Sequence, residues 1–248
     1  LGRMLALAAA PLGIKCHFVD PSPEAGAQIA AGQILAGYES IDALIALAEQ
    51  SDVVTFEFEN VSAPALDAIA GHTRIAPSPR SLQVSQDRLL EKQLFESLGF
   101  PVAPYRAVET LDNLESALEE IGTPAILKTR RLGYDGKGQV RIASAQEASR
   151  AWKSVESEPS VLEGFVDFTR ELSIVVVRAA DGSTVAYPLA ENVHRSGILH
   201  TSRAPVMSMD DPLQTLAFER ATAIAAELDH VGALALELFD VDGELVLN

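Results

Sequence analysis

The chain has 248 residues, of which 48% are hydrophobic and 22% charged, a composition that excludes collagenous and intrinsically disordered proteins. Its 19 Lys and Arg residues face 35 Asp and Glu, and the net charge of −16 disfavours nucleic acids and anionic membranes as partners. The single cysteine, Cys16, cannot form an internal disulfide, and no apolar run reaches the ~20 residues that span a bilayer, so we expect a cytoplasmic protein without a membrane anchor.

The first 80 residues alternate between helical and strand-like segments, which is the pattern of a parallel sheet covered by helices. The expected helices are 3–12, 41–49 and 63–70, and the expected strands are 14–19, 52–58 and 74–76. Because the chain opens on a helix, we expect the strand and turn that precede this helix to lie ahead of Leu1.

A second lobe is expected after Pro77 and Pro79, where two prolines mark a boundary. Its expected elements are helices at 86–98 and 111–121, strands at 125–128 and 161–163, and a helix around Trp152. Ser144 and Glu147 form the capping-box pattern that begins this last helix.

A third lobe is expected to contain two β-hairpins, which turn at Asp181–Gly182 and at Asp242–Gly243. The expected strands are 170–179, 183–189, 232–240 and 244–248, with a helix at 213–228. The predicted fold class is therefore α/β in three lobes, with boundaries at 1–79, 80–165 and 166–248.

The strongest local signal of a binding site is the segment 128–141, in which three glycines follow a strand that ends at Lys128. Glycine lets the backbone approach phosphate oxygens and present consecutive N–H groups, while Lys128 and Lys137 add positive charge. The spacing is not that of a Walker A loop, because GxxxxGK[ST] is absent. The segment predicts a phosphate-binding loop between two strands; the alternative is a glycine-rich hairpin with solvated charges.

Three further side chains are candidates, each with a simpler alternative. Arg88 lies in the first turn of its predicted helix, where a cation opposes the helix dipole, so it either binds an anion or pairs with Asp87 or Glu91. Glu237 alternates with apolar residues along its strand, where it either holds a cation such as Mg²⁺ or faces water on an edge strand. His194, predicted in a loop after a strand, either contacts a phosphate or a metal or is solvated.

Four segments together resemble the 5-(carboxyamino)imidazole ribonucleotide synthases, which are ATP-grasp ligases of purine biosynthesis. The segments are Thr55 to Asn60, Lys128 with Gly133 to Gln139, Tyr187 to His194, and Gly197 to Leu199. The resemblance runs through the whole chain in order, and its most specific part is Tyr-Asp-Gly-Lys-Gly-Gln at 134–139. It implies three lobes in which Mg-ATP binds between the central and the C-terminal lobe.

The resemblance also implies an activity: bicarbonate is phosphorylated to carboxyphosphate, and its carboxyl group passes to the amine of 5-aminoimidazole ribonucleotide. The implied phosphate-binding residues are Arg88, Lys128, Gly133, Tyr134, Asp135, Gly136, Lys137, Gly138 and Gln139. The implied adenine-binding strand and linker are Glu163, Gly164, Phe165 and Val166, with Glu171 for the ribose and His194 and Asn248 as further nucleotide contacts. The implied metal ligand is Glu237, and Lys128, Tyr134 and Asp135 are the implied catalytic residues, the last two as ribonucleotide contacts.

The family's glycine-rich first turn and its second metal carboxylate would lie beyond the two ends of this sequence. We therefore expect a chain truncated at both ends, which binds ATP weakly or not at all and lacks turnover. The resemblance further implies a homodimer. Two alternatives stay open: another ATP-grasp ligase such as the formate-dependent glycinamide ribonucleotide transformylase, which also forms an acyl phosphate, and a non-catalytic nucleotide-binding module.

Overall fold

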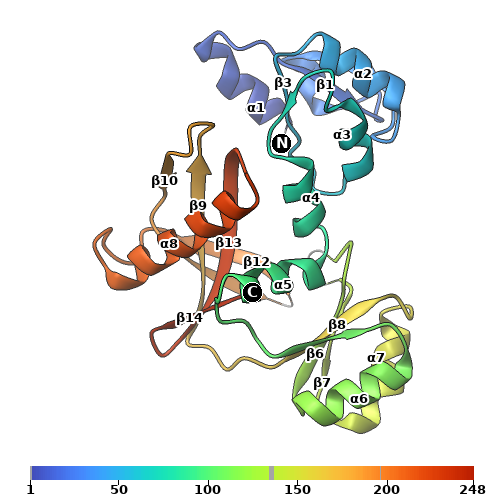
Figure 1. Cartoon of the computed structure of the whole chain (residues 1–248), viewed down its shortest axis with the longest axis vertical. Coiled ribbons are helices and arrows are strands. Elements are labelled where there is room, and N and C mark those ends of the chain that lie inside the picture. Colours follow the sequence, from blue (N-terminus) through green and yellow to red (C-terminus); the bar gives the residue numbers. More distant parts are fainter. Residues whose placement is uncertain (1, 134–136, 196) are drawn as a thin grey trace. The chain divides into compact units, whose positions relative to one another are not determined.

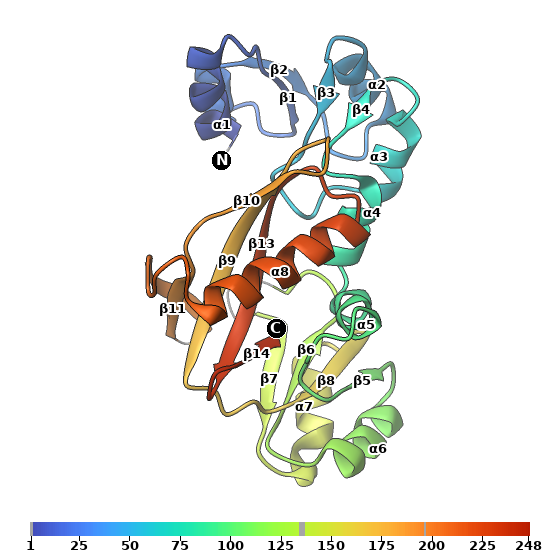
Figure 2. The same cartoon turned by 60° about the vertical axis from the view of Figure 1, so that its left-hand side comes forward.

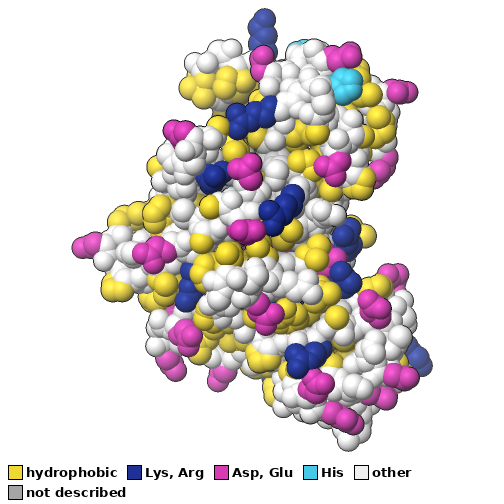
Figure 3. All heavy atoms as spheres, viewed as in Figure 1, with side chains coloured by type: hydrophobic (Ala, Val, Ile, Leu, Met, Phe, Trp, Pro, Cys, Tyr) yellow, Lys and Arg dark blue, Asp and Glu magenta, His cyan; other side chains and the backbone are white. Residues whose placement is uncertain are grey.

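The computed structural model of the chain describes residues 2–133, 137–195 and 197–248. Two compact units make up the chain, a first unit of Leu1–Gln83 and a second unit of Val84–Asn248 (Figure 1). Within the described ranges, no helix is long and apolar enough to cross a membrane. On the face drawn in Figure 3, Asp and Glu side chains are spread over both units, as the net charge of −16 requires.

The first unit contains two pairs of parallel strands covered by helices. Strand β1 (His17–Asp20) pairs with β2 (Gly32–Leu35), and β3 (Val53–Val54) pairs with β4 (Arg74–Ile75). The helical segments are α1 (Gly2–Ala9), η1 (Ala10–Leu12), η2 (Gly26–Ile29), α2 (Ile41–Glu49), α3 (Ala63–Ile69) and α4 (Pro79–Ser85). The parallel pairing confirms the predicted alternation of helices and strands.

The two strand pairs of the first unit do not form one continuous sheet. The strands follow the order β2, β1, β3, β4 across the unit (Figure 2), and a cavity of about 1010 Å³ lies between the two pairs. Its lining includes Phe18 and Val19 of β1 and both valines of β3. Leu44 of α2 and Leu66 and Ile69 of α3 belong to the hydrophobic core of this unit. These short strand pairs are therefore stabilised mainly by packing against the helices.

The second unit begins with a four-stranded antiparallel sheet in the order β5-β8-β6-β7. Its strands are β5 (Tyr105–Val108), β6 (Ala125–Thr129), β7 (Gln139–Ile142) and β8 (Ser160–Gly164). Its helices are α5 (Arg88–Ser97), α6 (Leu111–Ile121), η3 (Ala145–Glu147) and α7 (Ala148–Ser154). In place of the predicted capping box, Glu147 Oε2 accepts from Ala143 N at 2.8 Å, one residue before the N-cap Ser144, and the Ser144 side chain makes no cap.

A second antiparallel sheet completes this unit, in the order β12-β11-β9-β13-β14, with β10 also paired to β9. Its strands are β9 (Arg170–Arg178), β10 (Thr184–Ala186), β11 (Ala190–Arg195), β12 (Ile198–Arg203), β13 (Gly232–Val241) and β14 (Glu244–Leu247). Helix α8 (Pro212–Glu227) packs against β9 and β13 and buries Leu172, Ile174 and Ala221 between them. Both predicted hairpins are confirmed, with Gly182 and Gly243 at positive φ in their turns.

Several elements differ from the sequence-based expectations. Strand β1 begins three residues later than expected, and β3 is shorter than the predicted 52–58 segment. Helix α4 begins at Pro79, where only a boundary was predicted, because proline fits the first turn of a helix. Strands β2, β5, β11 and β12 were not predicted from the sequence.

Candidate functional site

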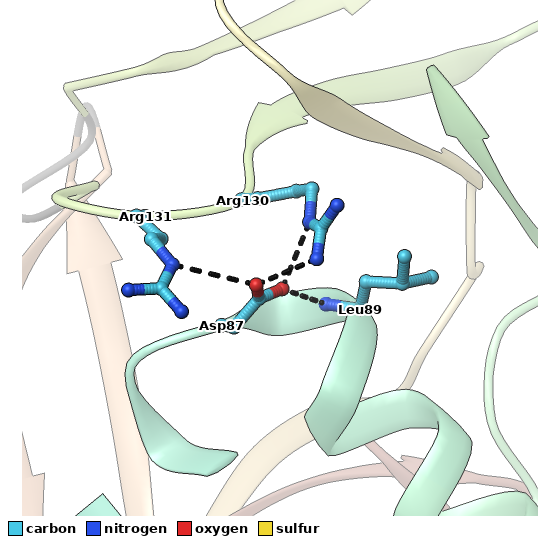
Figure 4. Close-up of polar contacts among 4 residues, drawn as sticks. All are labelled: Asp87, Leu89, Arg130 and Arg131. Atoms are coloured by element: carbon cyan, nitrogen blue, oxygen red, sulfur yellow. Dashed lines mark hydrogen bonds and ion pairs between the residues drawn. The ribbon is translucent and has the colours of Figure 1, made fainter. Parts of the chain in front are cut away.

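The start of α5 is tied to the end of β6 by Asp87 (Figure 4). Its carboxylate caps the helix, since Oδ1 accepts from Leu89 N at 3.1 Å. Arg130 donates to both oxygens, from Nε at 3.0 Å and from Nη2 at 2.7 Å, and Arg131 Nε donates to Oδ2 at 3.4 Å. Arg88 N also donates to the Arg130 carbonyl at 3.0 Å, so α5 and the phosphate-loop segment hold one another in place.

Asp87 is ionised in this environment. Burial alone would raise the pKa of its carboxyl group, but the hydrogen bond and charge of Arg130, the Leu89 amide and the charge of Arg131 together lower it. One predicted alternative for Arg88 was a pair with Asp87, yet the interactions of that carboxylate are with Arg130 and Arg131. Arg88 lies instead beside the glycine loop, because a Cβ at Gly133 would come within 3.3 Å of Arg88 Nη2.

The glycine loop requires glycine at position 138, next to the start of β7. Gly138 has a φ of +69°, and a Cβ there would lie 2.5 Å from Thr129 Oγ1. Its carbonyl accepts from Thr129 N at 2.7 Å, which closes the loop across β6 and β7. Lys137 and Gln139 beside it are exposed. Tyr134, Asp135 and Gly136 lie outside the described residues.

Lys128 forms the centre of a chain of polar side chains that runs from the buried Glu163 to the exposed Glu237. In the antiparallel register of β6 and β8, Glu163 lies opposite Ile126, so its side chain shares a sheet face with Lys128. Lys128 Nζ donates to Glu163 Oε2 at 3.0 Å and to Asn248 Oδ1 at 3.3 Å. Asn248 Nδ2 in turn donates to Glu237 Oε2 at 3.4 Å. The structure thus joins four of the predicted residues: Lys128 and Glu163 from the first sheet, Glu237 from the second, and Asn248 directly after β14.

Lys92 of α5 belongs to the same cluster, although it was not among the residues predicted from the sequence. Its Nζ lies 3.3 Å from Glu163 Oε2, and its side chain is only 4% exposed. The sequence signal for Lys92 is its spacing from Phe95. The two residues are three positions apart, so they lie on the same, buried face of the helix. A charged residue on an apolar face needs a buried partner, and Glu163 is that partner.

Opposite charges keep Glu163 ionised despite its burial. Burial would raise the pKa of its carboxyl group, but the charges of Lys128, Lys92 and Arg88 and the hydrogen bond from Lys128 lower it. Burial lowers the pKa of Lys92, the charge of Lys128 lowers it further, and Glu163 acts in the opposite direction. One carboxylate between two ammonium groups leaves this cluster with an excess of positive charge, which favours an anionic ligand.

The predicted linker follows directly from β8. Gly164 N donates to the Pro104 carbonyl at 2.8 Å, and Phe165 N donates to the Pro124 carbonyl at 3.2 Å. The guanidinium of Arg141 lies 4.6 Å from the centre of the Phe165 ring. Val166 is half-buried after it. This segment connects the two sheets of the second unit at the end where Glu163 lies.

Glu171 and His194 lie together on neighbouring strands. His194 belongs to β11, so its predicted place in a loop is wrong; a register irregularity at Val193 and His194 interrupts the strand pairing there. Because Asn192 pairs with Glu171 of β9, His194 Nδ1 reaches Glu171 Oε2. The acid and the imidazole that were predicted as ribose and nucleotide contacts therefore form one pair.

Glu237 differs from its predicted environment. It is exposed, as the alternative of a water-facing side chain predicted. Its strand is not an edge strand, however, since β13 lies between β9 and β14. Among the residues that the structure describes, no group of three or more His, Cys, Asp or Glu side chains is placed to hold a metal ion. Glu237 is thus an accessible carboxylate linked to Lys128 through Asn248.

Two domain families match the chain. The ATP-grasp domain family matches residues 93–248, and the ribonucleotide synthetase preATP-grasp domain family matches residues 1–86. The N5-carboxyaminoimidazole ribonucleotide synthase of Pseudomonas aeruginosa is 45% identical over 248 residues, which are 100% of this chain and 68% of that protein. The synthase of Bacillus subtilis is 39% identical over 250 residues, with 100% of this chain and 66% of that protein covered.

Solved structures show the same similarity. The N5-carboxyaminoimidazole ribonucleotide synthetase of Thermus thermophilus superposes with a TM-score of 0.93 at 42% identity, over 100% of this chain and 67% of that one. The synthase of Aspergillus clavatus in complex with ADP and 5-aminoimidazole ribonucleotide superposes with a TM-score of 0.91 at 28% identity. The match covers 100% of this chain and 66% of that one. The chain spans about two thirds of the length of these relatives.

Proposed function

The chain belongs to the N5-carboxyaminoimidazole ribonucleotide synthase family of ATP-grasp ligases, and from this membership we infer that it carboxylates 5-aminoimidazole ribonucleotide with bicarbonate at the expense of ATP. The products are the carboxyamino ribonucleotide, ADP and phosphate. The observation that best supports this function is Lys128, a buried cation held between Glu163 and Asn248 beside a glycine-rich loop. Such a site suits the phosphates of a nucleotide.

The reaction has two steps. A bicarbonate oxygen attacks the γ-phosphorus, the bond to the β-phosphate oxygen breaks, and ADP leaves with its electron pair. The amine nitrogen of the ribonucleotide then attacks the carboxyl carbon of carboxyphosphate, phosphate leaves, and the nitrogen loses a proton. Such phosphoryl transfer depends on positioning and on neutralised charge more than on a covalent nucleophile. We propose that Lys128, Arg88 and the loop 133–139 supply both.

We propose that Mg²⁺ accompanies the nucleotide and that Glu237 holds it together with the phosphate oxygens. The donor fits, because Mg²⁺ in phosphate sites commonly uses one or two protein carboxylates, and Glu237 is exposed next to Asn248. The bound ion would neutralise charge on the phosphates.

Glu237→Gln should abolish most of the dependence of ADP affinity on Mg²⁺. We expect Mg²⁺ to tighten ADP binding by roughly tenfold in the natural protein and by less than roughly threefold in the variant, as measured by calorimetric titration with and without the ion. Glu244→Gln, a change at another exposed glutamate of the same hairpin, is the matched control. Equal Mg²⁺ dependence in both variants would refute the role of Glu237.

Four further properties are part of the proposal. We assign three lobes at 1–79, 80–165 and 166–248, supported by the two hydrophobic cores of the second unit, of which the core of the second sheet also includes Phe95 of α5. We assign a homodimer, supported by apolar side chains of α1 that are about half or more exposed, Met4, Leu5 and Leu7. We assign a cytoplasmic location, supported by the single cysteine of the sequence. Tyr134 and Asp135 are assigned to the ribonucleotide, as the family resemblance implies.

ADP release by the natural full-length protein tests the reaction directly. With Mg-ATP and bicarbonate, we expect release to be stimulated by 5-aminoimidazole ribonucleotide and not by glycinamide ribonucleotide with formate. Stimulation by glycinamide ribonucleotide with formate alone would refute the carboxylation reaction, but the protein would still be a ligase that acts through an acyl phosphate. No ADP with either amine, despite ATP binding, would indicate a nucleotide-binding module without catalysis.

A further inference from the structure

Glu163 is shared by two lysines that approach the same carboxylate oxygen. Lys128 Nζ lies 3.0 Å from Glu163 Oε2 and Lys92 Nζ lies 3.3 Å from it. The first contact is a hydrogen bond and the second an ion pair without hydrogen-bond geometry. All three side chains are at most 10% exposed, so solvent cannot replace a lost partner.

The two lysines differ in what else they contact. Lys128 lies on β6, directly before the glycine-loop segment, and also donates to Asn248. Lys92 lies one turn into α5, and its Nζ has no hydrogen-bond partner among the residues that the structure describes. Glu163 Oε1 is likewise buried without a partner in that part of the chain. Lys92 and Glu163 thus retain hydrogen-bonding capacity for one another.

A lysine whose side chain turns toward a phosphate loosens its contact with its own carboxylate. If Lys128 were the sole counter-ion of Glu163, each such movement would leave a buried carboxylate unpaired, which is strongly unfavourable. The second ammonium group, already 3.3 Å away, removes that cost because it can take over the carboxylate.

We propose that Lys92 is a positioning residue that keeps Glu163 paired while Lys128 turns from Glu163 to the nucleotide phosphates. Lys92 itself does not contact the nucleotide. This inference rests on the proposed function, since it assigns Lys128 to ATP. A purely structural Lys92 would affect stability alone, whereas a positioning Lys92 affects ATP affinity through Glu163.

Lys92→Met keeps the length and burial of the side chain and removes its charge. In the natural full-length protein, we expect the Kd for ATP to rise at least ~10-fold, because Lys128 is then the only ammonium group left to pair with Glu163 and is held by that carboxylate. In the double variant Lys92→Met, Glu163→Gln, no carboxylate holds Lys128, which keeps only its contact with Asn248, and we expect at least ~3-fold of this loss to be recovered. Lys153→Met, at an exposed lysine of α7, is the control for loss of one charge.

Binding would be measured by calorimetry, with thermal unfolding of each variant alongside. A double variant that binds no better than Lys92→Met would overturn the inference, as would unchanged affinity in Lys92→Met. Natural protein that binds no ATP would overturn both the proposed function and this inference, so the two failures are distinguishable.

A structure of the unmodified protein with ADP gives a second test that needs no folded variant. We expect Lys92 Nζ within hydrogen-bonding distance of Glu163 and Lys128 Nζ more than about 3.5 Å from it, turned to phosphate. Lys128 still bonded to Glu163, with phosphate bound elsewhere, would overturn the inference.

Discussion

Replacing Lys128 by Met is expected to lower kcat/KM for ATP by at least about 100-fold. The substitution removes the cation of β6 that donates to Asn248 directly before the glycine loop, where we propose that the nucleotide phosphates bind. Folding should be largely retained, because Glu163 keeps Lys92 as a partner at 3.3 Å. ADP release at several ATP concentrations measures the loss, and thermal unfolding shows whether the fold persists.

The control for this variant is Lys153→Met, which removes an exposed lysine of the same unit and should leave kcat/KM unchanged. A Lys128→Met protein that is folded and keeps its activity within about threefold would contradict the assignment of Lys128 to the phosphates. A variant that fails to fold would show instead that Lys92 alone cannot neutralise Glu163, which contradicts the expected retention of the fold.

Asp87→Ala is expected to lower the free energy of unfolding of the second unit by about 2 to 4 kcal/mol. The change removes the cap of α5 and leaves the two-point contact of Arg130 without an acceptor. Urea denaturation at pH 7, followed by a signal from the second unit, measures the effect. Asp167→Ala, at an exposed aspartate of the same unit, should change this free energy by less than about 0.5 kcal/mol.

The effect of Asp87 should depend on pH in a defined direction. The pKa of Asp87 is lowered in the folded protein, so its stabilisation is fully present above the unfolded pKa of about 3.9 and is lost as pH falls through the lower folded value. The difference between natural protein and Asp87→Ala should therefore shrink below about pH 4. A difference that stays constant to pH 3 would contradict the ionic contribution of this carboxylate.

Local sequence signals predicted the parts of the fold that local interactions determine. Asp181–Gly182 and Asp242–Gly243 specify tight turns by their backbone preferences, and both hairpins are present. Helix α2 matches its predicted limits of 41–49, because its apolar spacing is regular. The glycine at 138 has the positive φ and the close contact that a phosphate-loop glycine needs.

Features that depend on distant parts of the chain could not be predicted in this way. Every residue of β12 is exposed, so it has no buried face and no apolar period to identify it. The environment of Glu237 depends on Asn248, and the partner of Lys92 lies 71 positions away at Glu163. The sequence pattern shows which side chains are unusual, whereas the pairing of β6 with β8 and the placement of α5 decide which of them meet.

The side chain of Asn248 has a fixed orientation because its two ends have different neighbours. Its oxygen faces the ammonium of Lys128 and its amide nitrogen faces the carboxylate of Glu237; a flipped amide would oppose like polarities at both ends. One amide thus connects the proposed phosphate position with the proposed metal position. A ligand that alters either neighbour changes the partners available at the other. We therefore expect the proposed cation and nucleotide affinities to be coupled, and thermodynamic reciprocity makes such a coupling equal in both directions.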